Sequence, residues 1–85
     1  MTVQIKSVEL YTLSTCPWCR KAKAFLDDRG VDYSYIDYDL ADEATQKRIS
    51  NELDAAGATG FPFVKVGEDV ISGYQPERYS SALGI

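Results

Sequence analysis

The chain has 85 residues, of which 45% are hydrophobic and 26% are charged. This length predicts a single domain over residues 1–85. The proportion of hydrophobic to charged residues excludes a disordered chain, which would combine low hydrophobicity with high net charge. The formal net charge is −4, so the chain lacks the basic surface typical of nucleic-acid-binding proteins. No apolar stretch approaches the roughly 20 residues that span a bilayer, and residues 1–10 lack the apolar core of a secretion signal. We therefore expect a soluble, cytoplasmic protein that binds neither nucleic acid nor membrane.

Few residue types are available for chemistry. Histidine is absent, which removes the usual base near neutral pH and the commonest metal ligand. The two cysteines, Cys16 and Cys19, are too few for a disulfide-stabilised scaffold. We predict no metal site within one chain, and any covalent chemistry centres on this cysteine pair.

The first part of the chain predicts a strand, a helix and a second strand. Val8–Leu13 alternates and is rich in strand formers. Pro17 suits the first turn of a helix, and Gly30 is placed to end that helix. The apolar residues between them recur at the spacing of one helix face: Trp18, Ala22, Phe25 and Leu26. Tyr33–Tyr38 alternates again and predicts the second strand.

A second helix is expected in the middle of the chain, capped by Asp39 or Asp42. Two glycines, Gly57 and Gly60, follow as terminators. Its inner face is predicted from three residues at helical spacing: Ile49, Leu53 and Ala56. Asp37 and Asp39 lie at the end of a strand, where we assign them to helix capping rather than to a functional site.

The last part of the chain predicts a hairpin and a short helix. Phe63–Val66 and Asp69–Ser72 are short strands separated by a tight turn. Gly73 interrupts the second strand, and Pro76 opens a helix that ends near Leu83. The resulting order is β-α-β-α-β-β-α, in which the first two strands are parallel and the last two antiparallel. We therefore predict an α/β fold with a four-stranded mixed sheet flanked by three helices.

Cys16 and Cys19 stand at the first strand-to-helix turn, where a CxxC motif is typical of thioredoxin-like redox proteins. The free N–H groups and the dipole of a helix N-terminus favour a thiolate, so we expect a lowered pKa for Cys16. Cys19 lies one turn further on and should be less exposed. This asymmetry predicts that Cys16 attacks a substrate disulfide and that Cys19 then resolves the mixed disulfide. The basic residues that follow either add positive charge near the thiolate or form a solvated helix face: Arg20, Lys21 and Lys23.

Three other interpretations of the cysteine pair compete with this one. A structural disulfide would close a loop too short to stabilise the fold much, and such bonds are rare in cytosolic proteins. A zinc site needs four ligands, which only a symmetric dimer of this chain could supply. Two unrelated buried cysteines would leave the proline and the tryptophan between them unexplained. The redox interpretation fits the sequence better than any of the three.

Several short segments, together with the cysteines, make the chain similar to the glutaredoxin family, which has the thioredoxin fold. They extend from Val8 to Leu83 and include Tyr11-Thr12, Cys16-Pro17-Trp18-Cys19, Lys21-Ala22-Lys23, Phe25-Leu26, Gly60-Phe61-Pro62-Phe63-Val64 and Ser72-Gly73-Tyr74. The resemblance implies a small dithiol thiol–disulfide oxidoreductase that reduces protein or glutathione mixed disulfides and acts as an electron carrier. It implies glutathione as a co-substrate and no tightly bound cofactor. At this size we expect a monomer.

The resemblance also implies a substrate groove beside the cysteines, lined by Pro17, Trp18, Phe61, Pro62, Gly73 and Tyr74. In this reading Pro62 is a cis-proline that faces the cysteines, and Phe61 offers its backbone N–H and C=O to the substrate. Trp18 lies either on the rim of the groove or in the core, because it shares a predicted helix face with Ala22.

Several positions depart from the pattern of glutaredoxins that use glutathione. A basic residue is common three positions before the first cysteine, where this chain has Leu13. Gly-Gly and then an acid are common after the last strand, where it has Ser72-Gly73 and then Tyr74-Gln75-Pro76. Ser72–Glu77 is instead similar to the Ser-Gly-Phe-Arg-Pro-Asp segment of redoxins that serve ribonucleotide reductase and take electrons from thioredoxin reductase. The expected partners are disulfide-bearing proteins, ribonucleotide reductase among the candidates, with glutathione or a thioredoxin reductase as electron donor.

A second hypothesis is a binding module, in which a dimer bridges a [2Fe–2S] cluster through Cys16 and two glutathione molecules, as in some glutaredoxins. Pro17 stiffens the loop that carries Cys16 and disfavours this arrangement. The departures in the glutathione groove argue in the same direction.

Overall fold

Four strands form the centre of the fold. The computed structural model describes residues 6–85, so the part of the N-terminal expectation that concerns residues 1–5 lies outside this range. The strands form one mixed sheet in the order β2-β1-β3-β4. They are β1 (Val8–Thr12), β2 (Ser34–Asp37), β3 (Phe63–Val66) and β4 (Asp69–Ser72). β1 runs parallel to β2 and antiparallel to β3, and β3 pairs antiparallel with β4, as predicted.

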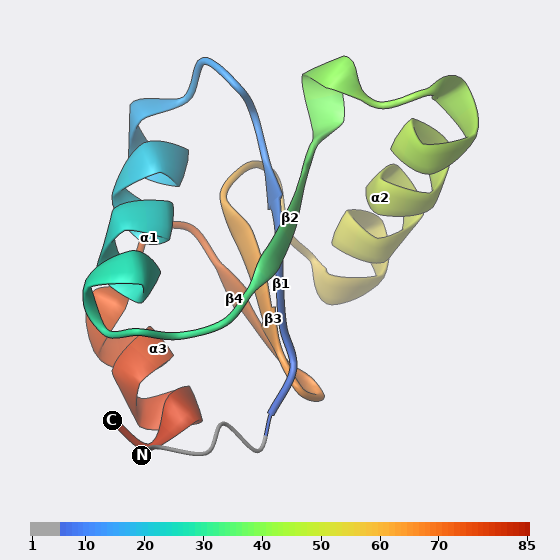
Figure 1. Cartoon of the computed structure of the whole chain (residues 1–85). Coiled ribbons are helices and arrows are strands. Elements are labelled where there is room, and N and C mark those ends of the chain that lie inside the picture. Colours follow the sequence, from blue (N-terminus) through green and yellow to red (C-terminus); the bar gives the residue numbers. More distant parts are fainter. Residues whose placement is uncertain (1–5) are drawn as a thin grey trace.

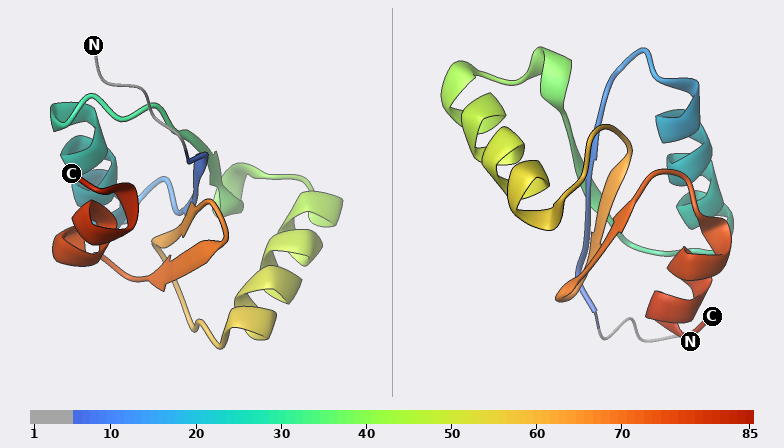
Figure 2. Two further views of the ribbon diagram at one scale, coloured as in Figure 1. Left: turned by 90° about the horizontal axis from the view of Figure 1, so that it is seen from below. Right: turned by 180° about the vertical axis from the view of Figure 1, so that it is seen from behind.

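Helices cover both faces of this sheet. They are α1 (Pro17–Asp28), α2 (Glu43–Ala56) and α3 (Pro76–Leu83), and a short 3-10 helix, Tyr38–Leu40, precedes α2. Figures 1 and 2 show α1 and α3 on one face and α2 on the other. The predicted α/β fold with a mixed four-stranded sheet and three α-helices is therefore confirmed for the described residues, with the 3-10 helix as an unpredicted addition.

Each face of the sheet has its own hydrophobic core, because side chains alternate between the two faces along a strand. Under α1 and α3 the buried cluster consists of Val8, Leu10, Ala22, Leu26, Val64, Val66, Ile71 and Tyr79. Under α2 it consists of Tyr11, Ile49, Leu53 and Phe63. The rings of Tyr11 and Phe63 stack across β1 and β3 with centroids 5.9 Å apart. Burial of both faces fixes the strand register, since a slip by one residue would exchange the two cores.

Two predicted helix faces differ from the structure. On α1 the buried side chains are Cys19, Ala22 and Leu26, whereas Trp18 is 54% exposed. Trp18 precedes Cys19 by about 100° around the helix axis, so its side chain leaves the buried face and contacts Tyr74 instead. On α2 the predicted inner residue Ala56 is exposed. The helix ends there, and Ala58 packs against that cluster instead.

Gly30 ends α1 as predicted, through a pair of backbone hydrogen bonds. Its N–H donates to the carbonyl of Asp27 at 3.1 Å, and the next N–H, of Val31, donates to Leu26 at 3.0 Å. This Schellman arrangement requires a left-handed residue, and Gly30 has a φ of 66°. Val31 then packs against the core under α1.

We expect Gly30→Ala to lower the free energy of unfolding by about 1 kcal/mol, because a Cβ disfavours this backbone conformation. A Cβ at this position would meet no atom within 4 Å, so the loss should come from the backbone alone. Urea unfolding would measure it. Gly30→Asn should cost less, since asparagine tolerates a left-handed conformation better. Equal losses in both variants would contradict this explanation.

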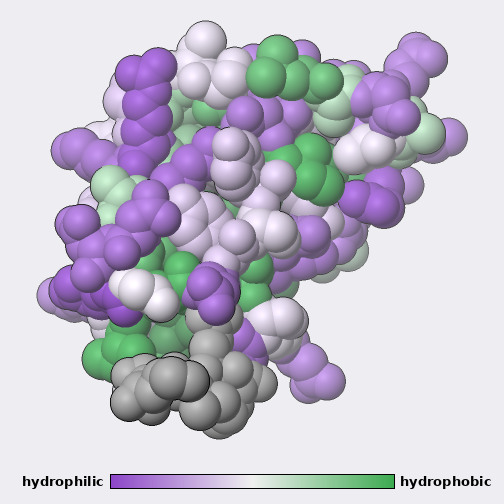
Figure 3. Space-filling model, in the orientation of Figure 1, coloured by the Kyte–Doolittle hydropathy of each residue, from purple (hydrophilic) through white to green (hydrophobic). Residues whose placement is uncertain are grey.

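The surface of the molecule is mainly polar. Figure 3 shows one face, on which hydrophilic side chains dominate and hydrophobic side chains form scattered patches. Within residues 6–85, no helix combines the length and the apolar character needed to cross a membrane.

Candidate active site

The cysteine pair lies where β1 passes into α1. Cys16 is the N-cap residue of α1, with extended backbone angles, and Pro17 occupies the first helical position. The N–H of Cys16 donates to the carbonyl of Leu13 at 3.1 Å, and the carbonyl of Cys16 accepts from the N–H of Arg20 at 3.2 Å. A tight turn and the first turn of the helix therefore fix the backbone of Cys16 on both sides. The free N–H groups of the helix N-terminus lie beside its sulfur.

The two thiols are both free, but their surroundings differ. Cys16 is partly exposed, whereas Cys19 lies on the buried face of α1 with no exposed surface. Partial burial raises the pKa of Cys16. Hydrogen bonds from the Cys19 thiol and from the backbone of Cys19 and Trp18 outweigh burial, so the pKa of Cys16 is lowered overall. Cys16 is thus the thiol that ionises first, as predicted.

Cys19 has the opposite tendency. Burial raises its pKa, and its hydrogen bond with Cys16 and the charge of Cys16 act in the same direction, to a pKa of about 12. A backbone hydrogen bond from Leu13 and the charge of Lys23 lower it in part. The pair therefore holds one accessible sulfur that readily becomes a thiolate and one buried sulfur that keeps its proton until the first has reacted.

This difference predicts selective alkylation. At neutral pH iodoacetamide should modify Cys16 and spare Cys19, because the thiolate is the reacting form. The rate should follow a titration whose midpoint lies below that of an ordinary cysteine thiol. Peptide mass spectrometry and a pH–rate profile would measure both. In Cys19→Ala the midpoint should rise, because the hydrogen bond from the Cys19 thiol is lost. Equal labelling of both cysteines would contradict the assignment.

The loops that carry the other predicted site residues are joined to each other. The Phe61–Pro62 peptide is cis, as predicted, and Pro62 is buried. The N–H of Gly73 donates to the carbonyl of Pro62 at 2.7 Å, so the loop after β4 is tied to the loop before β3. Tyr79 of α3 donates its hydroxyl to the carbonyl of Gly73. The ring of Phe61 packs against Tyr38 with centroids 5.4 Å apart.

An aromatic pair, formed by the exposed Trp18 and the partly buried Tyr74, lies beside the cysteines. The rings of Trp18 and Tyr74 have centroids 5.9 Å apart, and Tyr74 in turn packs edge-on against Tyr79 at 6.2 Å. The structure thus brings two of the predicted groove residues, from α1 and from the loop after β4, into contact. The alternative that Trp18 lies in the core is wrong, because more than half of its surface is exposed.

Asp37 and Asp39 also belong to the surroundings of the site, and their predicted role as helix caps is wrong. Asp42, the other predicted cap of this helix, is confirmed as the N-cap of α2, where its side chain accepts the N–H of Thr45 at 2.8 Å. Asp39 accepts the N–H of Ser14 at 2.9 Å and also its hydroxyl. These hydrogen bonds lower the pKa of Asp39 and anchor the turn that precedes Cys16.

The carboxylate of Asp37 is less exposed and contacts two side chains. It accepts the hydroxyl of Thr12 at 2.5 Å and lies 3.4 Å from the ammonium of Lys23. Thr12 is fully buried and is the register partner of Asp37 across β1 and β2. The parallel pairing of these two strands was predicted, and it places their carboxyl ends at one edge of the sheet. This predicted pairing could have indicated that Asp37 and Asp39 lie near the cysteine turn that follows β1.

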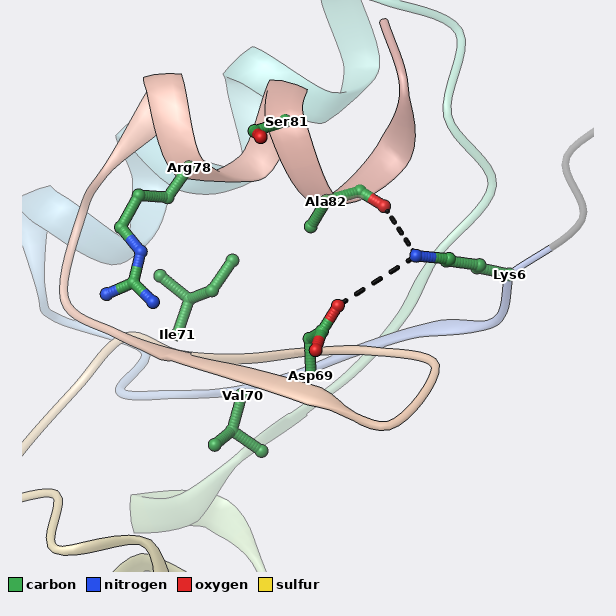
Figure 4. Close-up of a pocket in the computed structure, with 7 residues that line it drawn as sticks. All are labelled: Lys6, Asp69, Val70, Ile71, Arg78, Ser81 and Ala82. Carbon is green, nitrogen blue, oxygen red and sulfur yellow. Dashed lines mark hydrogen bonds and ion pairs between the residues drawn. The ribbon is translucent and has the colours of Figure 1, made fainter.

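A groove lies apart from the cysteines, between β4 and α3. It has a volume of about 350 Å³ and includes Lys6, Asp69, Arg78 and Ala82 among its lining residues. Figure 4 shows how Lys6 bridges its rim, by donating to the carbonyl of Ala82 at 3.0 Å and pairing with Asp69 at 3.8 Å. No predicted site residue lines this groove.

A dithiol at the N-terminus of the helix that follows the first strand, on a mixed sheet covered on both faces, defines a redox protein of the thioredoxin fold. Comparison with known proteins narrows this class. The sequence pattern of the glutaredoxin family matches residues 8–71. With more than half of the sequence matched, the chain belongs to the glutaredoxin family.

Solved structures agree with this assignment. Methanoredoxin from Methanosarcina acetivorans is 32% identical, with a TM-score of 0.83 over 93% of this chain and 85% of that one. A glutaredoxin from Methanosarcina mazei is 28% identical, with a TM-score of 0.87 over 99% and 85% of the two chains. The NrdH-redoxin of Escherichia coli, a glutaredoxin-like protein, is 25% identical, with a TM-score of 0.75 over 88% and 92%.

Proposed function

We propose that this protein is a dithiol thiol–disulfide oxidoreductase that reduces protein or glutathione mixed disulfides and carries electrons. Cys16 is the nucleophile and Cys19 the resolving thiol. The observation that carries this proposal is the opposite behaviour of two adjacent thiols. The accessible one has a lowered pKa, and the buried one has a pKa raised to about 12.

The proposed reaction has two steps. In the first, the Cys16 thiolate attacks one sulfur of the substrate disulfide and forms a mixed disulfide, while the other substrate sulfur leaves as a thiolate and takes up a proton. In the second, Cys19 loses its proton and attacks the sulfur of Cys16. The Cys16–Cys19 disulfide forms, and the second substrate thiolate leaves and is protonated. Two electrons pass from the dithiol to the substrate, and a separate donor then restores the dithiol.

We propose that the substrate lies in a groove between the start of α1 and the two joined loops. Pro17 and Trp18 would form one side of it, and Phe61, Pro62, Gly73 and Tyr74 the other. Support comes from the contact of Trp18 with Tyr74 and from the hydrogen bond between Gly73 and Pro62, which hold these segments in a fixed relation. The exposed Trp18 ring offers an apolar surface for a protein partner.

The electron donor is either glutathione or a thioredoxin reductase. Membership of the glutaredoxin family is consistent with the first. Similarity to NrdH-redoxin, whose structure is described as the basis of a thioredoxin-like activity profile, favours the second, as does the resemblance of the segment Ser72–Glu77 to such redoxins. We propose that the protein acts as a cytoplasmic monomer without a tightly bound cofactor, with glutathione as co-substrate in the first case.

Coupled assays would test this function. The oxidised protein is mixed with NADPH and either glutathione plus glutathione reductase or thioredoxin reductase, and the loss of NADPH is followed. Turnover in the first assay supports a glutathione-linked glutaredoxin. Turnover confined to the second supports a redoxin of the ribonucleotide-reductase type. No turnover in either would contradict both proposed electron donors and would point to a different donor or to the cluster-binding alternative.

A further inference from the structure

Lys23 is placed differently from the other cations of α1. It follows Cys19 by four residues, so the two side chains are neighbours on the same helix face. Its ammonium lies 3.4 Å from a carboxylate oxygen of Asp37 and 3.7 Å above the centre of the Tyr35 ring. The side chains of Lys23 and Asp37 are only 21% and 16% exposed. The ammonium of Lys23 is therefore partly buried and is held in place by Asp37 and the Tyr35 ring.

The remaining basic residues near the cysteines point elsewhere. Lys21 lies with its ammonium 4.5 Å above the ring of Trp18, on the exposed side of the helix. Arg20 is exposed as well. The sequence left open whether these three cations form a solvated face or act on the thiols. The structure separates Lys23, which is held by Asp37 and the Tyr35 ring on the helix face of the buried thiol, from the other two.

We propose that Lys23 is a positioning residue for the second step of the reaction, in which it stabilises the thiolate that Cys19 develops. The inference rests on the proposed function. In that step Cys19 gives its proton to solvent and its sulfur attacks Cys16. The Cys16–Cys19 bond forms as the bond from Cys16 to the substrate sulfur breaks, and that sulfur leaves with the electron pair.

A positive charge near Cys19 is needed because Cys16 loses its negative charge when it enters the mixed disulfide. In the free dithiol the Cys19 thiol donates a hydrogen bond to the Cys16 sulfur, which holds its proton. Once Cys16 is in a mixed disulfide, its negative charge is gone and Cys19 must ionise in a buried place. Tyr79 of α3 also faces Cys19, but its hydroxyl is neutral and donates to the carbonyl of Gly73. The charge of Lys23 favours the thiolate, and Asp37 holds that charge in place.

Asp37 fits this role because it is itself fixed. The hydroxyl of Thr12 donates to the same carboxylate oxygen that pairs with Lys23. Thr12 and Asp37 are paired across β1 and β2, so the sheet edge determines where the carboxylate lies. The Tyr35 ring provides a second contact for the ammonium. The pairing of β1 with β2 thus sets the position of Asp37, and Asp37 in turn holds the ammonium of Lys23 on the α1 face that carries Cys19.

The two steps can be timed separately with 5,5′-dithiobis(2-nitrobenzoate) as the disulfide. Attack by Cys16 releases the first nitrothiobenzoate in a phase that depends on reagent concentration. Attack by Cys19 releases the second in a phase that does not. In Lys23→Met the first phase should be nearly unchanged. The second should slow about threefold. A rise of about one unit in the pKa of Cys19 cuts its thiolate fraction about tenfold, but a more basic thiolate is also a better nucleophile, which offsets part of the loss in rate. Its pH profile should move about one unit to higher pH.

Matched variants separate electrostatics from structure. Lys23→Gln keeps a hydrogen-bond donor for Asp37 but removes the charge, and it should slow the second phase as much as Lys23→Met. Lys23→Arg should retain the wild-type rate and pH profile. Lys21→Met removes the same charge from the same helix and should leave the second phase unchanged. A normal second phase in Lys23→Gln, or an unshifted pH profile in both uncharged variants, would overturn the proposal. Absence of the first phase in the unchanged protein would instead overturn the proposed function.

Discussion

Replacing Cys16 by serine should abolish disulfide reduction. A serine hydroxyl does not ionise near neutral pH, so the hydrogen bonds that lower the pKa of Cys16 have no thiolate to stabilise. Cys19 cannot take over, because it has no exposed surface and its pKa is raised to about 12. The coupled assay that supports turnover of the unchanged protein would measure the loss. Retained turnover in Cys16→Ser would contradict the mechanism.

Cys19→Ser is the matched variant, and its expected result is different. The first step remains, but the mixed disulfide on Cys16 is no longer resolved and should accumulate. Intact-protein mass spectrometry after incubation with a disulfide substrate should show one adduct, removed by dithiothreitol. Urea unfolding of both serine variants is the control that the fold is intact. Two adducts on the unchanged protein, or none on Cys19→Ser, would refute the assignment of the two roles.

Leu26→Ala should have a large effect on stability. Its side chain is completely buried between α1 and the sheet, on the same helix face as Cys19. Removing a leucine side chain from such a site costs about 2–5 kcal/mol, a large part of the roughly 5–15 kcal/mol that stabilises a small domain. Urea unfolding would measure the change.

Leu40 provides the control for this substitution. It is 72% exposed in the short 3-10 helix before α2, so Leu40→Ala should change the free energy of unfolding by no more than about 0.5 kcal/mol. Similar losses in the two variants would contradict the assignment of the core. The contrast also tests the position of α1, because Leu26 holds the helix that presents the cysteines.

Strands and helix ends could be predicted well because their signals are local. Pro17 and Pro76 occupy the first turns of their helices, and Gly30 and Gly57 have the left-handed conformation that follows a helix. The rotation of a helix is harder to predict. The apolar spacing of α1 is satisfied by faces that differ by one residue, so spacing alone left Trp18 either on the rim of the groove or on the buried side, which Cys19 occupies.

In the site, too, features of short segments could be predicted, whereas contacts between distant residues could not. The cysteine motif could be recognised in one short segment, and the cis-proline was implied by the resemblance to the glutaredoxin family. The hydrogen bond between Gly73 and Pro62 and the pairing of Lys23 with Asp37 join residues far apart in the chain. Such contacts depend on strand register and side-chain direction, which composition and periodicity do not determine. Asp39 is the clearest case, because its carboxylate serves the turn at Ser14 and not the helix that follows it.

A redox titration would test the central claim most directly. Trp18 is the only tryptophan of the sequence and lies between the two cysteines, so its fluorescence should report their oxidation state. The protein is equilibrated with graded ratios of reduced and oxidised dithiothreitol. We expect one reversible transition with the slope of a two-electron couple, absent in Cys16→Ser and in Cys19→Ser. A signal that does not change with redox poise, or a transition that survives either substitution, would contradict a dithiol formed by Cys16 and Cys19.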